Sequence, residues 1–334
     1  MKILHITYHY GCASDLNYVF KTLGHEITFF DATCWPYTIT EDIAKNIWNE
    51  RKDYFQSFDI IITSDTVALS MIFLVHFEEL RARLIIWICN RFNFAMDTVG
   101  NFIPLLQKYK DRINIIPYIE YEKHWCSRFG LEICHDTINP LGRHAEKYIC
   151  NESVMNRIFC PLNRSHQTKP DNETIFVPDY HNNKRLLPIL INNHVSFVHG
   201  RYLDVNEIKP YKAVVTLPDA FGKFFYHEAI QHNIILLMPS TSFFDSLAKI
   251  NDYGITSKNS ETRDDIHVYC EYYSKYKNCY IYYNSYEDLI TKISDLDNYI
   301  PEIKNILQEQ KEIIHSHILK QWETVLAIEP RNST

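Results

Sequence analysis

Glycine is scarce in this sequence, and the glycine-rich signatures of the common nucleotide enzymes are missing. Only 8 of the 334 residues are glycine. Neither the GxGxxG turn of dinucleotide-binding folds nor the GxxxxGK[ST] phosphate loop occurs, and both need glycines that let the backbone approach a pyrophosphate. The HExxH, GxSxG and protein-kinase signatures are absent as well. A classical dinucleotide-binding or P-loop enzyme is therefore disfavoured.

The nine cysteines lack the close spacing of metal and redox sites, because no two of them lie two to four residues apart. This excludes a zinc ribbon and a CxxC redox motif. Cys89 lies in an apolar run and is predicted to be a small core residue. The odd count and the short apolar start, which is too brief for a signal peptide, favour a reducing compartment. We therefore expect a cytoplasmic protein.

Long hydrophobic runs and an excess of basic charge are also missing. The longest apolar stretch, residues 67–77, is interrupted by Ser70 and His76 and is too short to span a bilayer. Lys and Arg number 34 against 41 Asp and Glu, which gives a net charge of -7. Nucleic-acid binding needs a basic face. We expect neither a transmembrane segment nor a nucleic-acid partner.

What the chain does contain is an alternation of short β-branched runs with longer amphipathic segments, which is typical of parallel α/β folds. In the first 150 residues the expected strands are 2–7, 25–31, 59–64, 84–89 and 113–120. The expected helices are 16–23, 41–55, 66–83, 102–112 and 121–129, and residues 8–15 are predicted to form a polar turn. The length fits about two domains at the usual ~150 residues each.

The alternation resumes after a proline-containing connector at 134–171, in which residues 157–160 are a possible strand. The second set of expected strands is 174–178, 195–198, 213–217 and 234–238, with helices at 184–193, 224–232, 241–251, 286–300 and 303–328. The predicted organisation is an N-terminal domain over 1–150, a C-terminal domain over 151–312 and a C-terminal helix over 313–334 that packs back on the first domain.

No metal site is predicted. Asp295-Leu296-Asp297 has the DxD spacing that one class of sugar transferases uses for Mn²⁺, but it falls on a predicted amphipathic helix near the C-terminus. His315 and His317 are two residues apart, and on a helix such residues face different ways.

Polar residues at predicted strand ends mark the candidate site in the second half, because open α/β sheets bind ligands at the carboxyl ends of their strands. One strand ends at Pro218, a turn with Gly222 follows, and a helix begins near Lys223. Backbone N–H groups and the macrodipole at a helix start favour an anion. His199 and Arg201 follow another strand, and arginine can bind a phosphate in bidentate fashion. These residues are candidates for binding phosphate. The alternative is that they are ordinary charged residues on the surface.

Several of these segments together resemble the GT-B glycosyltransferases, in particular the GT4-like enzymes that use nucleotide sugars. Residues 23–30 (LGHEITFF) and 59–64 (DIIITS) are similar to two N-terminal segments of that family, and 116–123 (IPYIEYEK) followed by Gly130 is similar to the segment that closes its first domain. The clearest match covers 212–240, with Phe221-Gly222, Glu228-Ala229 and the strand before Pro239-Ser240.

The resemblance implies a GT-B fold of two Rossmann-like domains facing across a cleft, and a glycosyltransferase of the EC 2.4 class. Such an enzyme would move a sugar from a UDP- or GDP-linked donor to the hydroxyl of a glycan or glycoconjugate, without a metal. The residues that match donor-binding positions, or would support them, are Glu228, Lys223, Gly222, Arg201, Asp219 and His199. The glutamate matching Glu228 accepts hydrogen bonds from ribose hydroxyls in the family. Arg164 and Lys169 resemble an R-x4-K phosphate pair. The family's second glutamate is replaced by Ala220, with Asp219 one residue out of register.

The first domain supplies the candidates for catalysis and for the acceptor. His9 and Asp65 follow or end predicted strands, and one of them would serve as the base, since deprotonating a hydroxyl needs a positioned acid–base group. Tyr10, Gly11 and Arg91 are the candidate acceptor contacts, although loops hold polar residues in any protein.

Two other functions remain open. A GT-B epimerase or phosphorylase would use the same scaffold for other nucleotide-sugar or sugar-phosphate chemistry. A catalytically inactive GT-B-like binding module is favoured slightly by Ala220 and by the low glycine content. Such a module would not be stabilised by nucleotides, whereas a donor site would raise the melting temperature.

Overall fold

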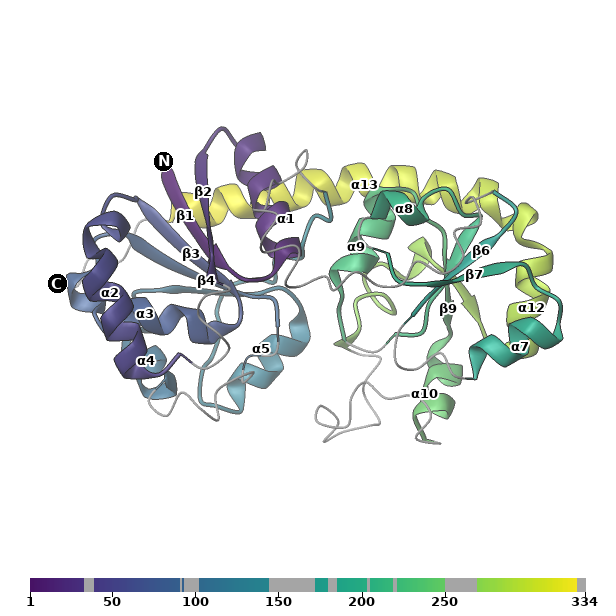
Figure 1. Ribbon diagram of the computed structural model, residues 1–334, viewed down its shortest axis with the longest axis horizontal. Coiled ribbons are helices and arrows are strands. Elements are labelled where there is room, and N and C mark those ends of the chain that lie inside the picture. Colours follow the sequence, from purple (N-terminus) through teal and green to yellow (C-terminus); the bar gives the residue numbers. More distant parts are fainter. Residues whose placement is uncertain are drawn as a thin grey trace. The chain divides into compact units, whose positions relative to one another are not determined.

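The computed structural model describes residues 1–32, 39–90, 92, 102–143, 172–179, 185–202, 205–218, 221–249 and 269–328 (Figure 1). The chain forms two compact units. Unit 1 comprises Met1–Cys160 together with Ser316–Thr334, and unit 2 comprises Pro161–His315. Each unit is described separately below.

Unit 1 is built on a five-stranded parallel sheet in the order β2-β1-β3-β4-β5. The strands are β1 (Lys2–Thr7), β2 (Glu26–Asp31), β3 (Ile60–Asp65), β4 (Arg83–Ile88) and β5 (Asn114–Pro117). The middle strands β3 and β4 are almost entirely buried, because helices cover both faces of the sheet (Figure 1).

The helices of unit 1 are α1 (Tyr10–Thr22), α2 (Glu41–Phe55), α3 (Met71–Leu74), α4 (Phe102–Tyr109), α5 (Glu120–Ser127) and the end of α13. Helix α2 has the bounds that its sequence predicts. Thr40 accepts a hydrogen bond from the Ile43 N–H, and two acidic residues lie in the first turn. This is a strong local start signal.

Helix α1 begins earlier than predicted, because residues 10–15 form its first turns and not a polar loop. Ser14 and Asp15 are buried there, and Asp15 has partners elsewhere in the chain. The Asp15 carboxylate accepts the N–H groups of Leu141 (3.0 Å) and Gly142 (2.7 Å). A buried carboxylate held in this way looks like a loop residue in the sequence but belongs to the interior.

The helix predicted over 66–83 is wrong in its length. The structure has two 3₁₀ turns, Val67–Ser70 and Phe77–Glu79, on either side of the four-residue α3. All eight residues of 67–74 are buried. Because this segment has no polar face, its sequence lacks the amphipathic pattern that marks the ends of a surface helix. The apolar run therefore did not show where the helix would be interrupted.

The end of α13 (Leu296–Ala327) packs into unit 1. Trp322 is fully buried, and its ring lies edge-on to those of Phe20 (5.2 Å) and Trp87 (5.7 Å). The Arg83 guanidinium donates hydrogen bonds to the last carbonyls of the helix, at Val325 and Leu326. A cation at a helix C-terminus is favourable for the macrodipole.

Unit 2 repeats this architecture with a parallel sheet in the order β10-β9-β8-β6-β7. Its strands are β6 (Ile175–Pro178), β7 (Phe197–Gly200), β8 (Ala213–Val215), β9 (Leu236–Pro239) and β10 (Ile281–Tyr283). Its helices are α7 (Leu186–Asn192), α8 (Val205–Ile208), α9 (Phe224–Gln231), α10 (Thr241–Lys249), α12 (Tyr286–Ser294) and the first part of α13.

The sequence did not predict β10, a short tyrosine-rich strand. It also placed the break before the last helix at Pro301, whereas the break lies at Asp295 and Pro301 is inside α13. Pro301 is the sixth residue of the helix, beyond the first turn, so the helix continues there without one of its i→i−4 hydrogen bonds.

Both sheets have the same strand order when numbered within each unit, namely 2-1-3-4-5. In this order the chain runs to one side of the first strand and then to the other. The topological switch point lies between β1 and β3 in unit 1 and between β6 and β8 in unit 2. The prediction of two α/β domains with parallel sheets is confirmed.

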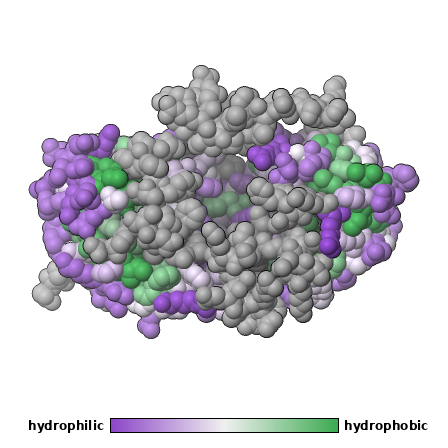
Figure 2. All heavy atoms as spheres, turned by 60° about the horizontal axis from the view of Figure 1, so that its bottom comes forward, coloured by the Kyte–Doolittle hydropathy of each residue, from purple (hydrophilic) through white to green (hydrophobic). Residues whose placement is uncertain are grey.

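On the face seen in Figure 2, the described residues show hydrophilic surface with apolar patches between. In the ranges that the structure describes, no helix combines the length and apolar character that a membrane span requires.

Candidate functional site

The carboxyl edge of unit 1 brings together His9 and Asp65, the two residues predicted to act in catalysis. His9 follows β1 and Asp65 is the last residue of β3, so they flank the switch point. His9 caps helix α1, because its Nδ1 accepts the N–H of Cys12 (3.3 Å) and its own N–H donates to Thr7 Oγ1 (3.1 Å). Strand ends at a switch point are where α/β sheets bind ligands.

Asp65 combines burial with an unusual backbone. Its side chain is buried and its φ is 71°, in the left-handed region that favours glycine. The Asn90 N–H donates to the Asp65 carbonyl (3.0 Å), which ties the end of β3 to the end of β4. Strained backbone of this kind costs about 1–3 kcal/mol and concentrates at functional sites.

The surroundings of Asp65 shift its proton affinity. Burial raises the pKa of the carboxyl above its ordinary value, and the charge of His9 with hydrogen bonds from Tyr8 and Asn90 offsets part of that rise. A raised pKa makes this carboxylate a stronger proton acceptor than an exposed aspartate.

Two thiols lie beside this pair, and the sequence gave no sign of their pairing. Cys12 is in the first turn of α1 and Cys89 directly follows β4. Each thiol acts on the other's proton affinity: Cys89 lowers the pKa of Cys12, and Cys12 raises that of Cys89. They are far apart in the sequence, so no spacing rule could join them. The prediction that Cys89 is buried is confirmed.

The predicted acceptor contacts lie differently from what was expected. Tyr10 and Gly11 are the first two residues of α1, with Tyr10 exposed, and do not form a loop. Arg91 lies outside the described residues. Glu122 is buried on α5 and accepts the N–H of Phe92 (2.8 Å). It therefore anchors the segment after β4, a role that the sequence analysis missed.

At the carboxyl edge of unit 2, the predicted phosphate ligands His199 and Arg201 face an acidic residue. His199 Nε2 lies 3.6 Å and Arg201 Nε 3.5 Å from the two carboxylate oxygens of Asp179, which follows β6. All three side chains are partly exposed. The sequence analysis missed Asp179, although it directly follows a predicted strand. The negative charge of Asp179 faces Arg201 and His199, which weakens the case for a bare phosphate site there.

The start of α9 holds the other predicted donor contacts. Lys223 is the N-cap residue of the helix without a side-chain capping bond, Gly222 precedes it, and Glu228 lies half-buried further along. At the end of β8 the hydroxyl of Thr216 is buried, and the described residues offer it no hydrogen-bond partner. Asp219, Ala220, Arg164 and Lys169 lie outside the described residues. The described part of this edge presents a helix start and a buried hydroxyl.

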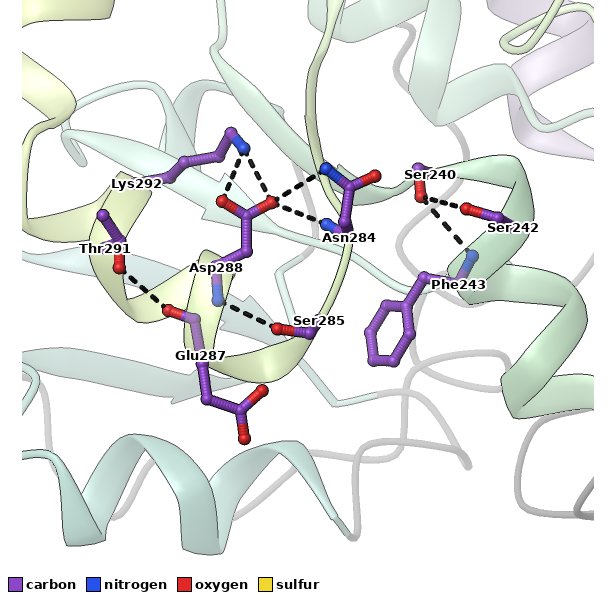
Figure 3. A network of polar contacts seen from close by, with 9 residues as sticks. All are labelled: Ser240, Ser242, Phe243, Asn284, Ser285, Glu287, Asp288, Thr291 and Lys292. Carbon is purple, nitrogen blue, oxygen red and sulfur yellow. Dashed lines mark hydrogen bonds and ion pairs between the residues drawn. The ribbon is translucent and has the colours of Figure 1, made fainter.

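The far end of the same edge is occupied by its own polar network (Figure 3). The Asp288 carboxylate accepts from the Asn284 N–H (2.7 Å) and from Lys292 Nζ (2.7 Å), and Ser285 Oγ accepts the Asp288 N–H (3.1 Å). Ser240 Oγ accepts from the Phe243 N–H (3.4 Å). These groups cap α12 and α10, so they serve local structure.

No cluster of three or more His, Cys, Asp or Glu side chains suited to a metal ion occurs within the described ranges. The absence of a metal requirement stays a prediction.

Comparisons with known proteins give similarity of architecture only. No known family matches this chain in a scan of family profiles. A search of curated proteins likewise returns no match.

Solved structures of similar architecture include a candidate UDP-N-acetylglucosamine 2-epimerase from Listeria monocytogenes (10% identity, TM-score 0.46, 91% of this chain and 90% of that one). Another is the UDP-GlcNAc 2-epimerase of Neisseria meningitidis bound to UDP-GlcNAc (11% identity, TM-score 0.42, 96% of this chain and 100% of that one). A third is S. aureus MnaA with UDP (8% identity, TM-score 0.39, 100% of this chain and 99% of that one).

These findings correct the predicted enzyme class. Two of the three structures named above are described as 2-epimerases, which are isomerases, and none of the three is described as a glycosyltransferase. The prediction of an EC 2.4 transferase is wrong on this comparison.

Proposed function

We propose that this protein is an isomerase of a nucleotide-linked sugar, in which the carboxyl edge of the unit 1 sheet transfers a proton. The observation that supports this most is the Asp65–His9 pair at the switch point. It offers a buried carboxyl of raised pKa beside an imidazole. Inverting a carbon that bears hydrogen needs one group to remove a proton and one to return it on the opposite face.

The roles follow from the surroundings of each group. Asp65 is held by the backbone link to Asn90, so its carboxyl is positioned before substrate arrives. His9 is exposed and fixed at the start of α1 by the Cys12 N–H that its Nδ1 accepts. The buried carboxyl and the exposed imidazole divide the two proton transfers between them, since their surroundings differ.

In unit 2, Glu228, Lys223 and Gly222 remain the proposed nucleotide contacts. A carboxylate without a competing donor suits ribose hydroxyls, and a helix start suits phosphate. The unpartnered Thr216 hydroxyl adds a donor at the end of β8. His199 and Arg201 are weaker candidates because Asp179 already faces both.

Solvent-isotope exchange tests the proposed chemistry directly. The protein is incubated with UDP-GlcNAc in D₂O, and proton NMR follows both the appearance of an epimeric sugar and the entry of deuterium at the inverted carbon. We expect exchange in the parent protein and its loss in Asp65→Asn, with thermal stabilisation by UDP retained. Asp59→Asn is the matched control, since this exposed aspartate lies at the amino end of the same strand, where it accepts the Lys2 N–H.

Nucleotide binding is measured separately by thermal stabilisation with UDP, GDP, CMP and their sugars. We expect Glu228→Gln to weaken stabilisation, whereas Glu302→Gln on the exposed face of α13 leaves it unchanged. Stabilisation without isotope exchange would reject the isomerase and retain a nucleotide-binding module. The absence of both would reject the nucleotide-sugar proposal itself.

A further inference from the structure

The segment that follows β4 lies beside the proposed proton-transfer pair, and hydrogen bonds hold its backbone at two places. The Asn90 N–H donates to the Asp65 carbonyl (3.0 Å), which is the bond that ties the end of β3 to the end of β4. Two residues further on, the Phe92 N–H donates to Oε2 of Glu122 (2.8 Å). One short segment therefore connects a carboxyl on α5 with the backbone of Asp65.

The contact with Glu122 lies in the interior of unit 1. Glu122 is 3% exposed and Phe92 is fully buried, and the Phe92 ring also packs against Phe129 (5.5 Å between ring centroids). A buried N–H group that loses its acceptor keeps the whole cost of its desolvation, so such a bond constrains the backbone more than one at the surface does. The carboxyl of Glu122 is therefore a fixed anchor for the end of the segment.

Asp65 needs an external constraint because its backbone is strained. Its φ of 71° is unfavourable for a residue other than glycine, and a conformation of this kind persists only where the surrounding structure imposes it. The bond from the Asn90 N–H is one such constraint. Oδ2 of the Asp65 carboxyl is buried and has no hydrogen-bond partner among the described residues, so the backbone helps to set where this oxygen lies.

We propose that Glu122 is a positioning residue for Asp65. Its carboxyl fixes the Phe92 N–H, this bond fixes the segment after β4, and the segment keeps the Asn90 N–H on the Asp65 carbonyl. Groups that act on a substrate need supporting contacts of this kind, which hold them in place before the substrate arrives. The catalytic consequence rests on the proposed isomerase function, whereas the positioning is a property of the folded chain and is measured without substrate.

Amide hydrogen exchange, resolved by residue with NMR, measures the positioning. Glu122→Met removes the acceptor and keeps a side chain of similar size, and Glu122→Gln keeps an oxygen acceptor. In Glu122→Met we expect the amides of Phe92 and Asn90 to exchange about tenfold faster than in the parent, while those in the middle of β1 keep their rates. Glu122→Gln should restore most of the protection. Glu120→Met is the matched control, since this residue is exposed on the same helix, where it faces Lys123 (3.4 Å).

Steady-state kinetics of epimerisation measures the catalytic consequence. In Glu122→Met we expect kcat to fall about 10- to 100-fold, because a displaced carboxyl no longer meets the carbon that it deprotonates. KM for UDP-GlcNAc and thermal stabilisation by UDP should stay at their parent values, since the proposed nucleotide contacts lie in unit 2. Glu122→Gln should recover kcat. A general loss of structure would change all three quantities together.

Two results in Glu122→Met would overturn the proposal: an Asn90 amide that exchanges at the parent rate, and a kcat equal to that of the parent. A third is read in the parent alone and decides the question if the variant does not fold. There the Asn90 and Phe92 amides should share one free energy of opening and one dependence on urea, and different values would reject the coupling. If the parent shows no epimerisation, the isomerase function is rejected, and the exchange measurements still decide the positioning.

Discussion

His5 should make unit 1 sensitive to mild acid. Its ring is fully buried on β1, with Nε2 2.8 Å from Ser64 Oγ and with Nδ1 lacking a hydrogen-bond partner among the described residues. Burial lowers the pKa of this histidine from 6.5 to about 3. The folded protein therefore keeps His5 neutral under conditions in which the unfolded chain protonates it.

The sign and the size follow from proton linkage. Between pH 6.5 and pH 3 the unfolded state binds one more proton at this residue, so the free energy of unfolding falls as the pH falls. At pH 5 an exposed histidine of pKa 6.5 is about 97% protonated, which lowers the free energy of unfolding by about 2 kcal/mol relative to pH 7. The slope approaches about 1.4 kcal/mol per pH unit at lower pH.

Tryptophan fluorescence reports this loss for unit 1 alone. The five tryptophans, at positions 35, 48, 87, 125 and 322, all fall within the ranges of unit 1, and unit 2 has none. Urea unfolding followed by tryptophan emission at pH 7 and at pH 5 gives the difference in unfolding free energy. We expect His5→Gln, which can keep the bond to Ser64, to reduce that difference by about 2 kcal/mol relative to the parent.

His227→Phe is the matched control. Burial also lowers the pKa of His227 to about 3, but this residue lies in unit 2. The tryptophan-reported loss should therefore persist in His227→Phe. If His5→Gln loses as much stability between pH 7 and pH 5 as the parent does, the reasoning about His5 is refuted.

Two further substitutions test the packing and the caps. Trp322→Ala should lower the free energy of unfolding by about 3–5 kcal/mol, because it leaves a cavity against Phe20 and Trp87. A fall in the melting temperature that corresponds to less than about 1 kcal/mol would show that the core does not need this end of the helix. Asp288→Ala should lower the free energy of unfolding by about 1 kcal/mol in thermal melts followed by circular dichroism, since it removes the carboxylate that accepts the Asn284 N–H at the start of α12. Asp295→Ala, at the exposed C-terminal end of the same helix, should be close to neutral, and equal effects of the two changes would contradict this role of Asp288.

Local signals in the sequence predicted the elements that local chemistry determines. Strand β1 and helix α2 have the predicted bounds, because a β-branched run and a threonine cap with acidic neighbours act over a few residues. The first turns of α1 were wrong for the opposite reason. Asp15 is polar in the sequence, yet it lies inside, bonded to Leu141 and Gly142. No local pattern can reveal a partner so far along the chain.

The candidate site shows the same division. His9 and Asp65 were predicted individually, because polar residues at the ends of β-branched runs are recognisable in one sequence. The position of Asp179 beside Arg201 was missed, because it depends on which strands are neighbours. The predicted transferase class was also wrong, since a fold supports many chemistries and the reaction depends on the arrangement of a few side chains.

The sequence by itself determined that this chain forms two α/β units with parallel sheets, since the alternation of strand and helix leaves few other ways to bury the apolar faces. Only the tertiary structure decided the strand order β2-β1-β3-β4-β5. That order places the ends of β1, β3 and β4 side by side, and with them His9, Asp65 and the two thiols. Hydrogen bonds, burial and the resulting pKa shifts act over a few ångströms in space, and distance in space is a property of the folded chain.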